Sequence, residues 1–128
     1  MAKNDAVVRH SAKARFEDVR DDLKLAIAGK GLVVDYESFI NRMLERTGKD
    51  VGSSRKLYRD AQAFVFCSAA LSRRTMEADP ANIAFCPYSI IVYETVQEPG
   101  RIHVTYQRSL PEVDALLDDI AREALGLR

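Results

Sequence analysis

The amino-acid sequence predicts an α+β fold: a mixed, mainly antiparallel β-sheet with helices packed on one face. Three observations support this fold class. Helical and β-rich patterns alternate along the chain, each helical pattern has one apolar side, and one pair of β-rich runs flanks a turn. The 128 residues, 47% of them hydrophobic, suit a single domain covering residues 1–128, and no linker or internal repeat divides them.

The predicted element order is β-α-β-α-β-α-β-β-α. Strands are expected where Val, Ile and aromatic residues concentrate, and helices where apolar residues recur three and four positions apart. The strands are predicted over 6–10, 32–34, 61–67, 88–96 and 101–107, and the helices over 15–28, 39–47, 69–78 and 110–125.

Two serines are predicted to begin helices. Ser68 follows the central apolar strand and is expected to cap the third helix. Ser109 and Glu112 have the spacing of a capping box and are expected to start the last helix. Gly48 and Gly126 are placed to end the helices that precede them.

The last two strands are predicted to form an antiparallel hairpin around a turn at 97–100. In its second arm three apolar residues share one face, namely Ile102, Val104 and Tyr106. His103 lies on the opposite face among polar residues, where we expect it to be exposed. That face is expected to be covered by a homodimer partner, to form a ligand groove or to face solvent.

Composition and charge argue against several classes of protein. Nineteen basic and nineteen acidic side chains give a formal net charge of zero, which disfavours nucleic-acid binding because phosphate contacts need a positive excess. The apolar runs are too short to cross a bilayer, and the amino terminus lacks the apolar region of a secretory signal. We therefore expect a cytoplasmic protein with no membrane or nucleic-acid partner, whose two cysteines are free thiols.

Cys67 and Cys86 are the main candidates for chemistry. Cys67 ends a strand directly before a helix, and the amino terminus of a helix can lower the pKa of a nearby thiol. The two side chains are interpreted as a reactive pair, as two soft metal ligands, or as two small buried apolar groups. Their separation of nineteen residues matches neither a Cys-x-x-Cys redox motif nor a zinc ribbon. Tyr88 is expected to line a groove or to pack in the core.

The remaining candidates have less support in the sequence. His10 and His103 would complete a ligand set with the cysteines, but the spacing follows no metal motif, so no metal and no cofactor are predicted. Adjacent carboxylates such as Asp118 and Asp119 are interpreted as surface charge. Because no hydrolase, Walker or zincin motif occurs, no catalytic residue is predicted. An enzyme without such a motif would use His103 or Tyr106 as a proton carrier.

Three segments together resemble a known family. They are 16–19 in the first helix, 63–68 at the end of the central strand, and 85–94 at the start of the hairpin. Over residues 8–125 the chain resembles the bacterial and archaeal family called domain of unknown function 302. It departs from the family pattern at Ser68, where asparagine is usual, and at Cys86-Pro87, where the proline usually precedes the cysteine. The resemblance implies a TATA-binding-protein-like curved sheet, homodimers, and cysteines that lie close together, but no established reaction.

These observations predict a homodimeric, non-enzymatic binding domain with a small-molecule pocket or groove at the cysteine-bearing strand ends. The predicted ligand-binding residues are Cys67, Cys86, Tyr88 and His103. The alternative is a thiol-based redox or metal-handling protein that uses the two cysteines.

Overall fold

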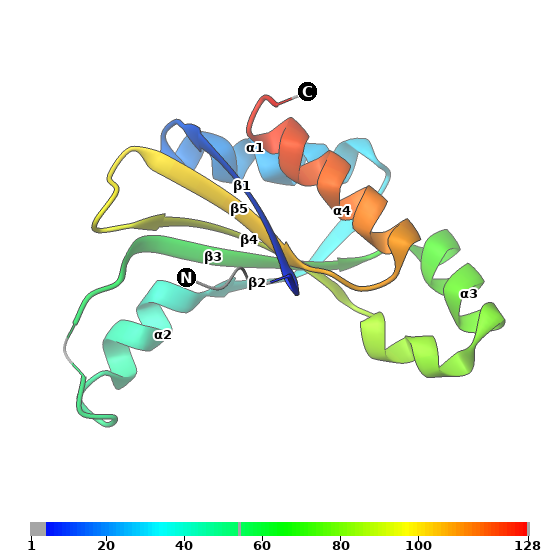
Figure 1. The fold of residues 1–128 in the computed structure, drawn as a ribbon, viewed down its shortest axis with the longest axis horizontal. Helices are drawn as coiled ribbons and strands as arrows, with labels where there is room; N and C mark the ends of the chain where they lie inside the picture. The colour runs from blue at the N-terminus through cyan, green and yellow to red at the C-terminus, as the bar shows by residue number, and fades with distance from the viewer. Residues whose placement is uncertain (1–4, 54, 128) are drawn as a thin grey trace.

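The computed structural model describes residues 5–53 and 55–127 and has one five-stranded sheet (Figure 1). The elements are β1 (Val7–Lys13), α1 (Phe16–Gly29), β2 (Val33–Phe39), α2 (Ile40–Thr47), β3 (Tyr58–Cys67), α3 (Ala69–Ala78), the 3₁₀ helix η1 (Pro80–Phe85), β4 (Tyr88–Thr95), β5 (Arg101–Gln107) and α4 (Pro111–Ala124). The predicted element order is therefore confirmed, and η1 is the one element added to it among the described residues.

The strands follow the spatial order β1-β5-β4-β3-β2, and all four neighbouring pairs are antiparallel. The order places β1 and β2 at the two edges, although they are the first two strands in the chain. The central strands β3 and β4 pair from Tyr58 and Thr95 at one end to Phe66 and Tyr88 at the other. The end of β3 therefore meets the start of β4.

One face of the sheet carries the core, and α1 and α4 lie side by side on it (Figure 1). Their apolar stripes bury against alternate residues of the three central strands, which is the period expected of a half-buried sheet. The largest fully buried side chains are Leu23, Ile27, Phe64, Phe66, Ile90, Val92, Ile102, Val104, Val113 and Ile120. The predicted inward side of the hairpin arm is thus confirmed.

Several boundaries differ from the prediction: β1 continues to Lys13 and β3 begins at Tyr58, and two differences have a local cause. The strand β2 runs to Phe39, which the sequence pattern placed in the following helix, and a bulge between Val34 and Tyr36 breaks the strand's alternation. The prediction that Ser109 caps the last helix is wrong. The N-cap is Leu110, with Pro111 at the first helical position, and the backbone N–H of Ser109 donates to the carboxylate of Asp114 at 2.8 Å.

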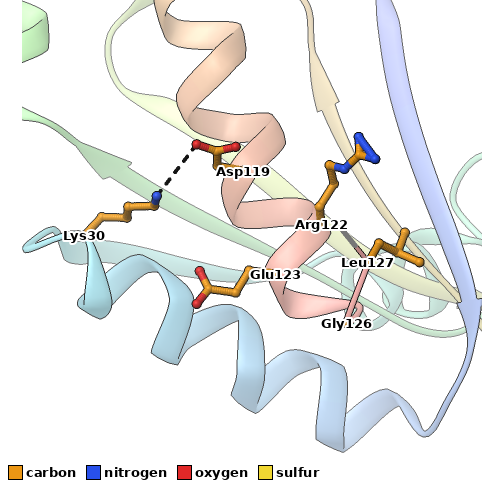
Figure 2. Close-up of a pocket in the computed structure, with 6 residues that line it drawn as sticks. All are labelled: Lys30, Asp119, Arg122, Glu123, Gly126 and Leu127. Atoms are coloured by element: carbon orange, nitrogen blue, oxygen red, sulfur yellow. Dashed lines mark ion pairs between the residues drawn. The ribbon is translucent and has the colours of Figure 1, made fainter.

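The carboxyl ends of α1 and α4 border an open hollow of about 460 Å³ (Figure 2). Lys30, just after α1, pairs with Asp119 of α4 at 3.7 Å across it. Arg122 and Glu123 add one charge of each sign to the same surface. These charges are exposed and compensate one another, so they add little to stability, and Leu127 is the one large apolar side chain in the lining.

No helix within the described part of the chain is both long enough and apolar enough to cross a bilayer. Residues 1–4, on which much of the expectation about the amino terminus rests, lie outside the described residues.

Candidate functional site

Cys67 and Cys86 lie side by side where β3 ends and β4 is about to begin. Cys67 is the last residue of β3, and Cys86 follows η1 directly, two residues before β4. Their Sγ atoms are 2.9 Å apart, both side chains are partly exposed, and neither is in a disulfide. The implied proximity of the two cysteines is confirmed: strand pairing joins thiols that are nineteen residues apart in sequence.

A pair of buried hydroxyl groups lies next to the two thiols. The hydroxyls of Ser72 in α3 and Tyr88 in β4 are 2.9 Å apart, and both side chains are buried. Ser72 also directs its hydroxyl at the Sγ of Cys86, at the long distance of 3.8 Å. The ring of Tyr88 packs edge-on against Phe66 at 6.1 Å between centroids. Tyr88 therefore links the thiols to the core.

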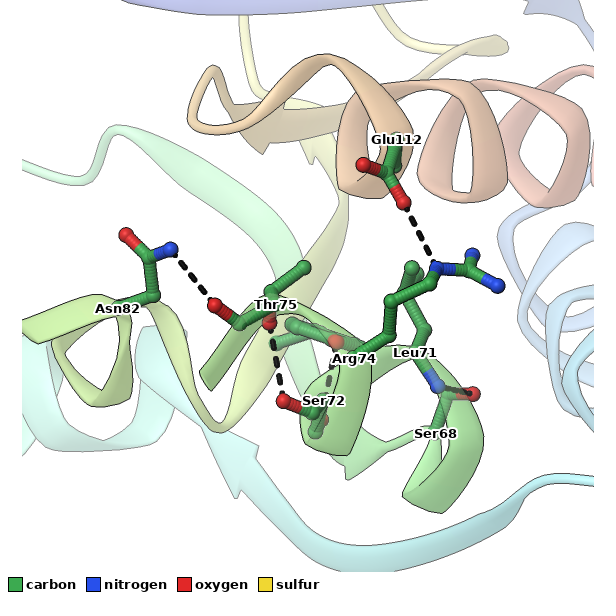
Figure 3. A network of polar contacts seen from close by, with 8 residues as sticks. Ser68, Leu71, Ser72, Arg74, Thr75, Asn82 and Glu112 are labelled. Atoms are coloured by element: carbon green, nitrogen blue, oxygen red, sulfur yellow. Dashed lines mark hydrogen bonds and ion pairs between the residues drawn. The ribbon is translucent and has the colours of Figure 1, made fainter. Parts of the chain in front are cut away.

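Local hydrogen bonds fix α3 and η1 between the two cysteines (Figure 3). Ser68 caps the helix as predicted, since its hydroxyl accepts from the backbone N–H of Leu71 at 3.3 Å. The Thr75 hydroxyl donates to the carbonyl of Ser72 at 3.0 Å, and the side-chain amide of Asn82 in η1 donates to the Thr75 carbonyl at 2.8 Å. These bonds join α3 and η1 into one excursion of the chain that begins and ends at the two cysteines.

The surroundings of Cys67 favour the neutral thiol. Burial, the hydrogen bond with Cys86 and the charge of Cys86 raise the pKa of Cys67 to about 11, against a backbone hydrogen bond at Tyr88 that lowers it. The prediction that the start of α3 lowers this pKa is therefore wrong. One N–H of the first turn of α3 is already taken by Ser68, and burial is the largest cause of the shift.

Burial also raises the pKa of the Tyr88 hydroxyl, although its hydrogen bond with Ser72 opposes the shift. Near neutral pH, Cys67 and Tyr88 therefore both keep their protons.

A small hollow adjoins Tyr88. Its volume is about 210 Å³, and Phe85, Pro87 and Tyr88 face Arg108 and Leu117 across it. Phe85 and Pro87 are the chain neighbours of Cys86, but the lining includes neither cysteine.

His103 lies apart from the other three predicted site residues. It is only 3% exposed, so the expectation of an exposed histidine is wrong. Its ring stacks on Tyr93 at 4.8 Å, and its Nδ1 lies 2.6 Å from the Ser11 hydroxyl of the neighbouring strand. Burial, the largest cause, lowers the pKa of His103. Since His103 pairs with Tyr93 in the sheet, it stands five residues along β4 from Tyr88, roughly 17 Å at the usual rise per residue.

Sequence patterns also missed a cluster between β1, β5 and α4. The carboxylate of Asp118 lies 2.7 Å from Nε2 of His10 and accepts from the Tyr106 hydroxyl at 2.8 Å. Burial is the largest cause and would raise the pKa of Asp118, but these two hydrogen bonds together with the charges of His10 and Arg122 leave the pKa below its usual range. The interpretation of Asp118 as plain surface charge is therefore wrong, and the alternation that turns His10 and Tyr106 towards α4 is the signal that pointed to it.

His10 and His103 do not form a common ligand set with the two cysteines. His10 contacts α4 on the core face of the sheet, whereas His103 stacks on Tyr93 on the other face. Within residues 5–53 and 55–127, no three His, Cys, Asp or Glu side chains are grouped as metal ligands.

Fold and site together define an α+β domain with two adjacent thiols at the joined ends of two neighbouring strands. The family model described as "Domain of unknown function DUF302" matches residues 7–125, nearly the whole chain. The protein therefore belongs to the DUF302 family.

A solved structure supports the same fold. It is the uncharacterized conserved protein DUF302 from Bacillus stearothermophilus, with a TM-score of 0.67 over 96% of this chain and 95% of that chain. The two sequences are 12% identical, so the likeness concerns the fold alone. No curated protein matches the sequence.

Proposed function

We propose that this protein uses Cys67 and Cys86 as a reversible dithiol–disulfide pair. The observation that carries the proposal is the distance of 2.9 Å between the two sulfur atoms. A disulfide bond is about 2.05 Å long, so less than about 1 Å of further approach closes it. Both side chains are partly exposed, which gives a reaction partner access to them.

The proposed reaction is thiol–disulfide exchange with a small or protein disulfide. One S–S bond of the partner breaks and one forms between Cys67 and Cys86. Two electrons pass from the two thiols to the partner disulfide, which leaves as two thiols and takes up the two protons.

The order of the two steps follows from the asymmetry of the pair. Burial and the hydrogen bond with Cys86 raise the pKa of Cys67, so we assign the first attack on the partner to Cys86. The mixed disulfide on Cys86 then carries neither the charge nor the hydrogen bond that Cys86 exerts on Cys67. Two causes of the raised pKa are thereby removed, and Cys67 becomes the better nucleophile for the second step.

Equilibration with mixtures of reduced and oxidised glutathione tests the proposal. We expect one two-electron transition, in which the intact protein loses two hydrogens in its mass spectrum and both thiols become unreactive together. The variants Cys67→Ser and Cys86→Ser should each lose this transition completely. If the wild-type protein keeps two thiols in excess oxidised glutathione, or only accumulates glutathione adducts, the proposal is refuted.

A second candidate function is binding of a small ligand beside Tyr88. The hollow of about 210 Å³ between Phe85, Pro87 and the first half of α4 favours it. Native mass spectrometry of the purified protein would reveal a retained ligand. The same spectra and light scattering test the homodimer that the sequence predicts, and a monomer at micromolar concentration would contradict it.

A further inference from the structure

The helix α2 differs from the other three α-helices because none of its residues is buried. It directly follows the edge strand β2 and contacts β3 at the end of the sheet away from α3 (Figure 1). Met43 and Leu44 are apolar, yet about two fifths of each side chain is exposed. An amphipathic helix normally buries such residues, so its apolar side lacks a cover.

An open hollow of about 390 Å³ lies beside this helix. Leu44 of α2, Val51 and Leu57 of the following loop and Tyr58 of β3 form its apolar wall. Val51 is 75% exposed and Leu57 is 46% exposed, so the wall stands in contact with solvent. The volume lies within the range of small-molecule sites, roughly 300–1,000 Å³.

The loop is folded closely onto the end of α2. The N–H of Ser53 donates to the carbonyl of Gly48 at 2.9 Å. A Cβ atom at Gly48 would stand 2.5 Å from the backbone oxygen of Ser53, so this approach requires glycine. Backbone contacts between Gly48 and Ser53 thus fix the loop that carries Val51 beside α2.

The rim of the hollow has an excess of positive charge. Lys49, Arg55 and Lys56 line it together with one carboxylate, Glu45. Glu45 pairs with Lys56 at 3.4 Å. Lys49 and Arg55 form no ion pair with any residue in the described part of the chain. Two cations next to an exposed apolar wall complement a ligand that has an anionic head and an apolar chain.

We propose that this hollow binds a free, single-chain carboxylate of the fatty-acid type. The chain lies along Leu44, Val51 and Leu57, and the carboxylate meets Lys49 and Arg55. The site is independent of the thiol pair, because β3 separates Tyr58 from Cys67 by about 30 Å at the usual rise per residue. Reduction, oxidation or replacement of the cysteines should therefore leave this binding unchanged.

Titration of the isotope-labelled full chain with sodium decanoate, followed by NMR, tests the proposal. Saturable shifts are expected at the lining residues, with a dissociation constant below about 1 mM. Hexanoate, octanoate and decanoate should bind with increasing affinity, by about three- to fourfold for each methylene that the wall accepts. Decyltrimethylammonium, which has the same chain and the opposite charge, should bind more weakly.

Two lysine variants separate a local role of charge from a general one. Lys49→Glu should weaken decanoate binding by at least about two- to fivefold, the size of an exposed charge interaction. Lys13→Glu is the matched control, because Lys13 is an exposed lysine on β1 that does not line the hollow, and it should change nothing.

Three results would overturn the proposal: no shifts, affinity independent of chain length, or equal binding of the cation. Sedimentation of the protein with phosphatidylglycerol vesicles, without any response to decanoate, would also overturn it, because the surface would then recognise a membrane.

Discussion

The segments next to the two ends of β3 differ in how much of their surface is buried. Beyond its carboxyl end the chain runs through α3 and η1, and the buried hydroxyls of Ser72 in α3 and Tyr88 in β4 are bonded to each other. At its amino end α2 and the following loop stand beside the strand without burying a single α2 residue. The closed end holds reactive groups at fixed distances, whereas the open end offers surface.

This difference separates two kinds of function. Sulfur chemistry depends on the distance between two atoms, so it benefits from a tightly packed corner. Ligand binding depends on surface that is still exposed, so it benefits from a helix that lacks a cover. The following changes are designed to break or sharpen this contrast.

The largest effect is expected from removing a ring at the closed end. Phe66 is fully buried against Tyr88, so Phe66→Ala should lower the free energy of unfolding by about 3–5 kcal/mol. Phe39, at the open end, is 41% exposed, and Phe39→Ala should cost about 1 kcal/mol or less. Urea unfolding measures both. Equal losses would mean that the open end is as well packed as the closed one.

Oxidation of the thiol pair should stabilise the protein by about 3 kcal/mol, the value for a cross-link that closes a loop of about 20 residues. The loop consists of α3, η1 and their connections, which the disulfide would tie together at their base. Unfolding of the oxidised and reduced protein in urea measures the difference, and Cys86→Ser under the same oxidant is the control. Equal stability of the two redox states would contradict a stabilising cross-link between Cys67 and Cys86.

Loss of one hydroxyl at the closed end should have a smaller effect. Tyr88→Phe leaves the buried Ser72 hydroxyl without its partner and should cost about 1–2 kcal/mol. Tyr36 is exposed on β2, so Tyr36→Phe should leave stability unchanged. The difference in stability between the two variants, measured by thermal or urea unfolding, isolates the buried hydrogen bond. Equal stability of the two variants would mean that the hydrogen bond between Ser72 and Tyr88 does not stabilise the protein.

The smallest effect concerns the reactivity of Cys67. Because its pKa is raised to about 11, its labelling by iodoacetamide should be slow at pH 8 and rise with pH until that range. In Cys86→Ala the hydrogen bond and the charge of Cys86 are both lost, so the pKa of Cys67 should fall. Peptide mass spectrometry should then find several-fold faster labelling of Cys67 at pH 8. Slower labelling in the variant would reverse the roles assigned to the two thiols.

The element order could be predicted because each helix and most strands carry their own local pattern. The capping role of Ser68 was also local, since a serine before an apolar helical stripe needs no distant partner. The proximity of Cys67 and Cys86 came from the family resemblance, and strand pairing explains it.

Contacts between distant segments could not be predicted. The alternation of β5 put His103 on a polar face, but the ring that covers it belongs to Tyr93 on the adjacent strand. In the same way, Asp118 looked like surface charge because its partner His10 is 108 residues away. The exposure of α2 could not be predicted either, because an apolar stripe in the sequence does not show whether another element packs against it.

The strand order described above also bears on how the protein avoids aggregation. A sheet with two free edges presents backbone groups that can template further strands. On the β2 edge, the bulge between Val34 and Tyr36 breaks the straight ladder that such growth requires. The β1 edge has regular pairing, and it carries the exposed side chains of Arg9 and Lys13. Stacking copies of the chain along that edge would crowd these positive charges together, so a high salt concentration should be the condition under which the protein aggregates most readily.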